Sequence, residues 1–124
     1  MKVLLSIKPK FVEQIFSKKK RFEYRKTVFS NKNIDTVIIY ASKPIGRIVG
    51  EFHVKQILCD TPENIWSKTN QYAGVSYEFF VQYFQDKEKA YAIEIDKVFQ
   101  YDEPINPYAK YSNFTAPQSF CYIK

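Results

Sequence analysis

Apolar and charged side chains alternate strictly in residues 21–25, Arg-Phe-Glu-Tyr-Arg. Successive side chains of a β-strand point to opposite faces of a sheet, so this alternation predicts a half-buried strand. Residues 47–58 repeat the pattern over a longer stretch, with Ile48, Phe52 and Val54 on one face and polar residues on the other. A chain with two such stretches must build a sheet with a covered apolar face, and this requirement constrains its fold more than any other feature.

The other elements follow from similar patterns. Pro9 suits a first helical turn, and Phe11, Val12, Ile15 and Phe16 then share one helical face. We expect further strands in residues 2–7, 35–42, 89–101 and 117–123, and further helices in 60–69 and 73–84 with Thr61 and Ser76 as their N-caps.

This order of elements predicts an α+β protein with a mostly antiparallel sheet curled around one core and three flanking helices. About half a dozen strands in 124 residues suggest a small, partly open barrel. The length fits one domain over residues 1–124.

Composition excludes several classes of protein. Hydrophobic residues make up 45% of the chain, which is far too many for a disordered protein. The apolar run in residues 3–7 is shorter than the about 7–15 residues of a signal peptide, and no segment approaches the about 20 of a membrane span. We therefore expect a cytoplasmic protein without a membrane partner.

Potential metal ligands are few. Cys59 and Cys121 form no Cys-x-x-Cys pair, and His53 is the only histidine. A structural zinc site takes about four such ligands, so we expect no metal and no cofactor. The two cysteines are interpreted as reduced, partly buried thiols.

Charge is distributed unevenly along the chain. Residues 1–32 hold ten Lys and Arg and two acids, a balance of +8, whereas residues 33–124 hold nine Lys and Arg and eleven acids, a balance of −2. Such asymmetry is typical of a face that binds anions, most often nucleic acid. Solvation of an exposed segment explains it equally well.

Residues 17–26 carry most of this charge. On the expected strand, Arg21, Glu23 and Arg25 share one face with about 6.5–7 Å between neighbours. Arginines in this arrangement can form bidentate hydrogen bonds with phosphate groups or with the edges of bases. Three exposed charges pairing across one strand would contribute almost nothing to stability. Lys20 falls on the aromatic face, where a lysine either extends to solvent or lines a cleft.

The stretch SIKPKFVEQIFSKKKRFEYRK, residues 6–26, resembles the start of the ASCH (activating signal cointegrator homology) domain, a family within the PUA-like RNA-binding folds. The family signature is a helix ending in glycine, followed by x-Lys-x-x-Glu-x-Arg, which falls here on Lys20, Glu23 and Arg25. Lys18 stands where the family has the glycine. YASKPIGRIVGEF, DTPENIW, EKAYAIEI and APQSF resemble later parts of the family in the same order.

The resemblance implies a five- or six-stranded pseudo-barrel with a cleft beside the first helix. It implies RNA, another nucleic acid or a nucleotide-like compound as the ligand, and a role as a regulator of transcription or translation. The cleft is expected to collect Lys8, Lys20, Glu23, Arg25, Ser42, Lys43, Gln118 and Ser119, with Lys18 and Arg21 on its basic rim. Tyr24, Tyr40 and Phe120 are candidates for stacking on a base, although aromatic residues at strand positions more often belong to the core.

Two classes of function remain open, and we favour a binding module over an enzyme. Some small relatives of this type remove an acyl group from acetylcytidine, and others are described as ribonucleases. The acyl-removing relatives place a threonine three residues after the lysine, where this chain has Glu23, and a carboxylate cannot copy a hydroxyl nucleophile. If the protein is an enzyme, Lys20 and Glu23 are the expected pair, activating a water molecule. Nothing in the sequence indicates the oligomeric state.

Overall fold

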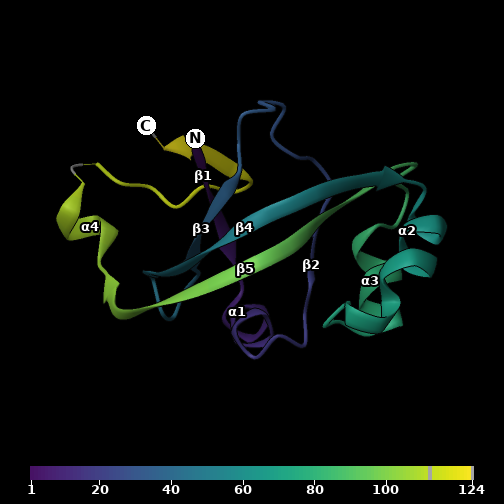
Figure 1. Cartoon of the computed structure of the whole chain (residues 1–124), viewed down its shortest axis with the longest axis horizontal. Coiled ribbons are helices and arrows are strands. Elements are labelled where there is room, and N and C mark those ends of the chain that lie inside the picture. Colours follow the sequence, from purple (N-terminus) through teal and green to yellow (C-terminus); the bar gives the residue numbers. More distant parts are fainter. Residues whose placement is uncertain (112, 124) are drawn as a thin grey trace.

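Six strands form one mixed sheet, which confirms the expected α+β class (Figure 1). The structure is a computed structural model, and it describes residues 1–111 and 113–123. The strands are β1 (Lys2–Ile7), β2 (Phe22–Arg25), β3 (Thr36–Ala41), β4 (Arg47–Asp60), β5 (Ala90–Ile105) and β6 (Phe120–Ile123). The helices are α1 (Pro9–Phe16), α2 (Pro62–Thr69), α3 (Tyr77–Tyr83) and α4 (Pro107–Lys110), with a 3₁₀ turn at Asn70–Tyr72.

The sheet order is β2-β5-β4-β3-β1-β6. Only β1 and β3 run parallel, and the other neighbours are antiparallel, as expected. The long β4–β5 pair spans the molecule, with α2 and α3 at one end and α4 at the other (Figure 1). The helix α1 lies beside the middle of this pair (Figure 1).

The sheet does not close into a barrel, because β2 and β6 remain edge strands. Side chains join the two edges instead. The Arg25 guanidinium donates through Nη2 to the Ser6 carbonyl at 2.8 Å and through Nη1 to the Ser119 carbonyl at 3.5 Å. The hydroxyls of Thr27 and Ser119 lie 3.2 Å apart. The expected partly open pseudo-barrel is therefore held together by polar contacts rather than by a ladder.

The strand β2 differs from the half-buried strand that its alternation predicted. Glu23 is only 5% exposed, and Phe22 and Tyr24 are buried as well. The reason is that α1 and β1 cover the face that carries the charges, while α2 and α3 cover the aromatic face, where Tyr24 packs on Phe80 with ring centroids 5.0 Å apart. Arg21 lies outside the strand and is exposed.

Local capping signals locate most helices. The side chains of Thr61 and Ser76 accept hydrogen bonds from the amides of Asn64 and Phe79, so both expected N-caps are confirmed. The expectation of three helices is wrong, since α4 is a fourth. It begins where Asn106 caps the amide of Tyr108 and a proline occupies the first turn, a start signal in a segment rich in prolines.

The first helix ends in a left-handed turn at Lys18, whose φ is +66°. The amide of Lys18 donates to the Ile15 carbonyl and that of Lys19 to the Gln14 carbonyl, each at 3.0 Å. These two bonds form a Schellman motif, the turn that usually carries glycine at this position. A lysine here keeps the family's turn at a conformational cost.

Lys18→Gly is therefore expected to stabilise the protein by up to about 1 kcal/mol, because glycine adopts positive φ without a Cβ penalty. Urea unfolding of both proteins measures the change. Lys19→Gly is the matched control and should not stabilise, since Lys19 is not among the residues with positive φ. A loss of stability in Lys18→Gly would mean that the lysine side chain itself stabilises the turn.

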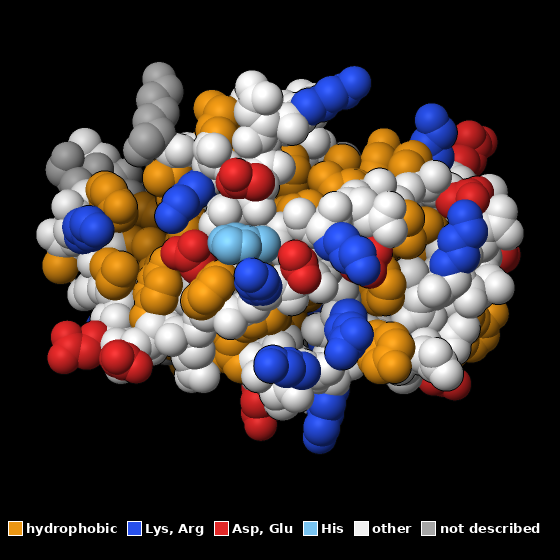
Figure 2. Space-filling view, viewed as in Figure 1, with side chains coloured by type: hydrophobic (Ala, Val, Ile, Leu, Met, Phe, Trp, Pro, Cys, Tyr) orange, Lys and Arg blue, Asp and Glu red, His pale blue; other side chains and the backbone are white. Residues whose placement is uncertain are grey.

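Surface features differ from expectation in two respects. Cys59 and Cys121 are both exposed rather than partly buried, because each lies near the end of a strand with its side chain away from the core. On the face seen in Figure 2, basic side chains lie among acidic ones around His53, so this face carries no continuous basic surface.

In the described part of the chain, no helix is long and apolar enough to cross a membrane.

Candidate functional site

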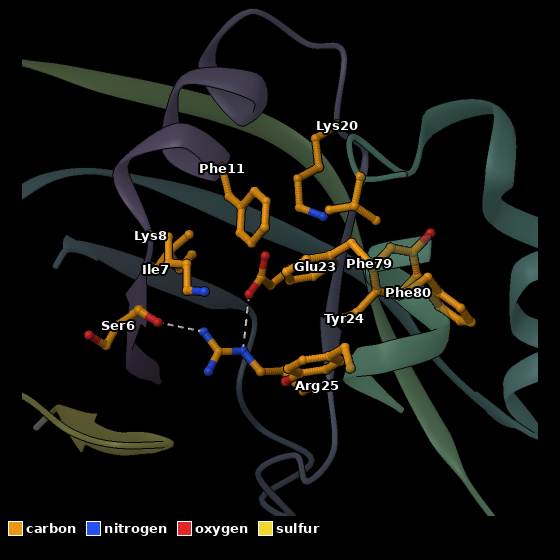
Figure 3. A pocket seen from close by; sticks show the side chains of 12 residues that line it. Ser6, Ile7, Lys8, Phe11, Lys20, Glu23, Tyr24, Arg25, Phe79 and Phe80 are labelled. Atoms are coloured by element: carbon orange, nitrogen blue, oxygen red, sulfur yellow. Dashed lines mark hydrogen bonds and ion pairs between the residues drawn. The ribbon is translucent and has the colours of Figure 1, made fainter. Parts of the chain in front are cut away.

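A pocket of about 130 Å³ lies between β1, α1, β2 and α3 (Figure 3). Its walls are Ser6, Ile7, Lys8 and Phe11 from the first strand and helix, Lys20, Glu23, Tyr24 and Arg25 from β2 and its approach, and Val75, Phe79, Phe80 and Tyr83 from α3 and the preceding turn. A cavity of about 150 Å³ holds one benzene ring, so this pocket suits a single planar ring. We call it the Lys20 pocket.

Lys20 is the most deeply placed charge in the Lys20 pocket. It is 2% exposed, and its ammonium donates to the Ala73 carbonyl at 2.8 Å. Nζ also lies 4.7 Å from the centre of the Tyr24 ring and 5.2 Å from that of Phe11. The faces of two aromatic rings and one backbone carbonyl thus interact with the ammonium in place of water molecules.

The stem of Lys20 is held by a glycine. Gly74 has φ of +69°, and a Cβ added there would lie 2.5 Å from Cβ and 2.7 Å from Cγ of Lys20. The backbone at residues 73–74 therefore supplies both the carbonyl that binds the ammonium and the surface on which the stem packs. The Tyr24 ring beneath it is anchored by its hydroxyl, which lies 2.7 Å from the Thr69 hydroxyl.

Glu23 and Arg25 form the opposite, polar wall. Nε of Arg25 donates to one carboxylate oxygen of Glu23 at 3.1 Å, and the pair is largely buried, with the Arg25 side chain 12% exposed and that of Glu23 7% exposed. The other oxygen of Glu23 has no hydrogen-bond partner among the described residues, and in Figure 3 it points toward the space below Phe11 and Lys20. Lys20 and Glu23 form no ion pair within 4.0 Å in the described structure, so a ligand can lie between them.

Burial lowers the pKa of Lys20 from its ordinary value of 10.5 to about 8, against the Glu23 charge, which raises it, while Arg25 lowers it further. The ammonium form therefore predominates near neutral pH, yet the neutral amine is accessible within about one pH unit. A lysine tuned in this way can donate a hydrogen bond, transfer a proton or bind an anionic group.

Protein stability is expected to rise by about 2 kcal/mol between about pH 7.5 and pH 9.5 because of Lys20. Below about pH 8 the lysine is protonated in both states, and its buried charge opposes folding. From there to pH 10.5 the unfolded chain binds more protons than the folded one, so stability increases with pH. Tyr24 and Tyr40, whose pKa values burial raises to about 12, reverse the trend above about pH 10.

Urea unfolding at the two pH values measures this effect, with Lys20→Met as the reference that keeps every other titrating group. The wild type should gain stability relative to the variant as pH rises. Parallel pH profiles for the two proteins would show that the folded state does not shift the lysine's protonation.

Four of the residues expected in the cleft line the Lys20 pocket, namely Lys8, Lys20, Glu23 and Arg25. Ser119 lies next to it, since its carbonyl accepts from Arg25. Ser42, Lys43 and Gln118 are not among the lining residues. Ser42 and Lys43 lie in the turn after β3, where the Ser42 amide donates to the Ile7 carbonyl, and Gln118 lies in the segment before β6.

The expected basic rim lies elsewhere. Lys18 and Arg21 line another hollow, which shares Lys20 with the Lys20 pocket and is otherwise lined by residues of mixed charge, including Lys55, Lys97, Glu94 and Asp96. Arg21 does not face the Lys20 pocket, because the strand begins only at Phe22 and the Arg21 guanidinium stacks over the Tyr72 ring at 4.8 Å.

Of the stacking candidates, only Tyr24 reaches the pocket. Tyr40 is buried with its hydroxyl 2.8 Å from that of Tyr108, and Phe120 packs edge-on against Phe29.

Sequence reasoning missed the aromatic wall from α3. In the sequence, Phe79, Phe80, Tyr83 and Phe84 share one apolar side of the helix expected in residues 73–84, a pattern that is more typical of a core than of a ligand site. In the structure Phe80 and Phe84 are buried, whereas Phe79 and Tyr83 are half-buried and line the pocket. The available signal was the presence of two aromatic pairs on adjacent faces of one short helix, more than a single buried stripe requires.

The fold and the pocket define a small α+β domain with a pocket between its first helix, α1, and the charged strand β2. No group of three or more His, Cys, Asp or Glu side chains that could hold a metal ion occurs among residues 1–111 and 113–123. The profile of the ASCH domain matches residues 5–99, and the chain belongs to this family.

Individual relatives extend this comparison. The large ribosomal subunit protein uL22 of Ureaplasma parvum serovar 3 is 27% identical over 123 residues, and the chain spans only 39% of that protein's length. The ASCH domain-containing ribonuclease of Zymomonas mobilis is 26% identical over 127 residues, which cover 98% of this chain and 83% of the relative. The crystal structure of ASCH from Zymomonas mobilis superposes with a TM-score of 0.92 at 25% identity, covering 99% of this chain and 87% of that one.

Proposed function

We propose that this domain binds single-stranded RNA in the cytoplasm and holds one nucleobase in the Lys20 pocket. The observation that carries the proposal is the pocket itself, which has room for one planar ring between aromatic side chains and places a cation and a carboxylate at its polar wall. Sequence-specific RNA recognition commonly uses bases that are splayed out, stacked on aromatic rings and hydrogen-bonded at their edges. The relative named as a ribonuclease supports RNA as the polymer.

The polar groups of the Lys20 pocket match the edge of a base. The Lys20 ammonium is a hydrogen-bond donor, and the free oxygen of Glu23 is an acceptor. The two groups lie on opposite sides of the pocket and form no ion pair with each other in the described structure. Every nucleobase edge presents hydrogen-bond acceptors, and most present an N–H donor as well. A base between the two charged groups would satisfy both, and this gives a physical reason for keeping them buried.

Binding of this kind should weaken as salt rises, because Lys8 at the mouth of the Lys20 pocket releases counterions from the RNA. Lys8→Ala is expected to lower affinity for a short single-stranded RNA and to reduce the slope of log affinity against log salt by about 0.7. Fluorescence titration over a range of salt concentrations measures both quantities.

Lys32→Ala removes the same charge from an exposed position outside the Lys20 pocket and is the matched control. It should leave the salt slope nearly unchanged. Equal effects of the two variants, or affinity independent of salt, would contradict the proposed binding mode. Binding without chemistry would fit a regulator of transcription or translation.

A second candidate is cleavage of the RNA backbone, favoured by the lysine with a pKa of about 8 that faces a carboxylate with one free oxygen. In this mode Glu23 takes the proton of the ribose 2′-hydroxyl, and the 2′-oxygen attacks the adjacent phosphorus. The bond to the 5′-oxygen breaks, and the leaving oxygen takes a proton from Lys20, giving a 2′,3′-cyclic phosphate and a 5′-hydroxyl end. The ribose and phosphate, rather than a base, then lie between the two side chains.

A further inference from the structure

A second pocket of about 280 Å³ adjoins the Lys20 pocket. The two share a wall made of Phe11, Val75 and Phe79. Because α1 and the turn before α3 form both pockets, a ligand that extends from the first along α1 enters the second. We call it the Gln14 pocket.

The Gln14 pocket differs from its neighbour in chemistry. Its own side chains are polar, with Lys10 and Gln14 from α1 and Ser76 from the cap of α3. The Gln14 amide makes no hydrogen bond with a described residue through its side chain, so it offers one acceptor and two donors. Lys10 is exposed and adds a positive charge. This set suits a polar, negatively charged group attached to a ring.

Phe79 is the central element of the shared wall. The ammonium groups of Lys8 and Lys10 lie 5.7 Å and 5.6 Å from its ring centre, one at each pocket. Two aromatic rings also contact it: that of Tyr83 lies 6.0 Å away and almost parallel at 11°, and that of Phe11 lies 5.3 Å away and edge-on at 77°. Single-strand-binding proteins combine such aromatic rings with nearby cations, so that bases stack while the backbone meets positive charge.

We propose that the Gln14 pocket binds the nucleotide next to the one held in the Lys20 pocket, so that the minimal ligand is a single-stranded dinucleotide. The proposal rests on the function proposed above and adds a second subsite to it. Phe79 separates the two bases, while Lys8 and Lys10 contact the two phosphate groups of a 5′-phosphorylated dinucleotide, one on each side of the ring. Two neighbouring bases held apart by a ring are unstacked, which a duplex does not allow.

The test compares each of four 5′-phosphorylated 2′-O-methyl homodinucleotides with its own 2′-O-methyl 5′-mononucleotide by calorimetry, since the methyl group blocks cleavage through the 2′-oxygen. The wild type should bind the dinucleotides about 5- to 30-fold more tightly, the gain expected from stacking one further base. Lys10→Ala and Gln14→Ala should remove most of this preference while leaving mononucleotide affinity nearly unchanged. Lys89→Ala, which removes an exposed charge outside both pockets, should preserve the preference.

The outcomes separate the two proposals. Equal affinity for mononucleotide and dinucleotide would overturn the second subsite but leave base binding in the Lys20 pocket intact. A dinucleotide preference that survives in both Lys10→Ala and Gln14→Ala would also overturn it, because the second nucleotide would then bind elsewhere. Binding of neither compound would overturn the proposed function, and the subsite with it.

Discussion

Lys20→Met is expected to weaken RNA binding by about 10- to 100-fold while the protein remains folded. Methionine preserves most of the stem that packs on Gly74 and Tyr24, so little volume is lost. The ammonium, however, is the buried donor of the Lys20 pocket, and a hydrogen bond to a charged group contributes about 1.5–3 kcal/mol. The variant loses the hydrogen bond to the Ala73 carbonyl, which destabilises it, but it also lacks the buried charge, which stabilises it. The free energy of unfolding near neutral pH should therefore change little.

Titration of a short single-stranded RNA, together with urea unfolding, separates these effects. Lys19→Met is the matched control because Lys19 is exposed and lies outside both pockets. If the wild type cleaves RNA, the cyclic phosphate product should disappear in Lys20→Met and persist in the control. Unchanged binding and cleavage in Lys20→Met would exclude the Lys20 pocket as the functional site.

Gly74→Ala is expected to destabilise the protein by about 2–4 kcal/mol, for two separate reasons. The positive φ of Gly74 costs an alanine about 1 kcal/mol. In addition, its Cβ would overlap the Lys20 stem at 2.5 Å, and overpacking typically costs about 1–3 kcal/mol. Because the stem must move to make room, RNA binding should weaken as well.

Gly46→Ala isolates the first of these two costs. Gly46 has a similar φ of +62°, but an added Cβ there would meet only the Tyr40 hydroxyl at an ordinary 3.6 Å. Urea unfolding should show a loss of about 1 kcal/mol for Gly46→Ala and a clearly larger loss for Gly74→Ala. Equal losses would mean that Lys20 moves freely, and that its position is not set by the glycine.

Local chemistry predicted much of the fold. Alternation predicted β2 and β4, hydroxyl side chains at Thr61 and Ser76 predicted two helix starts, and the family's turn predicted the left-handed backbone at Lys18. Each of these features is caused by interactions between residues only a few positions apart in the chain, so a local stretch of sequence is enough to predict it. The fourth helix had a start signal of the same kind, which the density of prolines obscured.

The site depended on contacts between distant segments. The resemblance to the family identified Lys20, Glu23 and Arg25 as candidate site residues. The alternation in β2 predicted a half-buried strand, because a local pattern cannot show that both faces of the strand are covered. Glu23 is buried among residues from distant segments such as Phe11 and Phe79, and Arg25 donates to the carbonyl of Ser119, 94 positions away in the chain. Likewise, no local rule distinguishes Phe79, which lines the pockets, from Phe80, which enters the core.

The sequence alone therefore determined the secondary structure, the turn at Lys18 and the position of the charged strand, because backbone hydrogen bonding and side-chain period act over a few residues. The depth of Lys20, the open gap between its ammonium and Glu23, and the aromatic wall from α3 follow only from the packing of α1, β2 and α3. Burial and the electrostatic environment of a charge are properties of all the atoms around it, and most of those atoms come from remote parts of the chain.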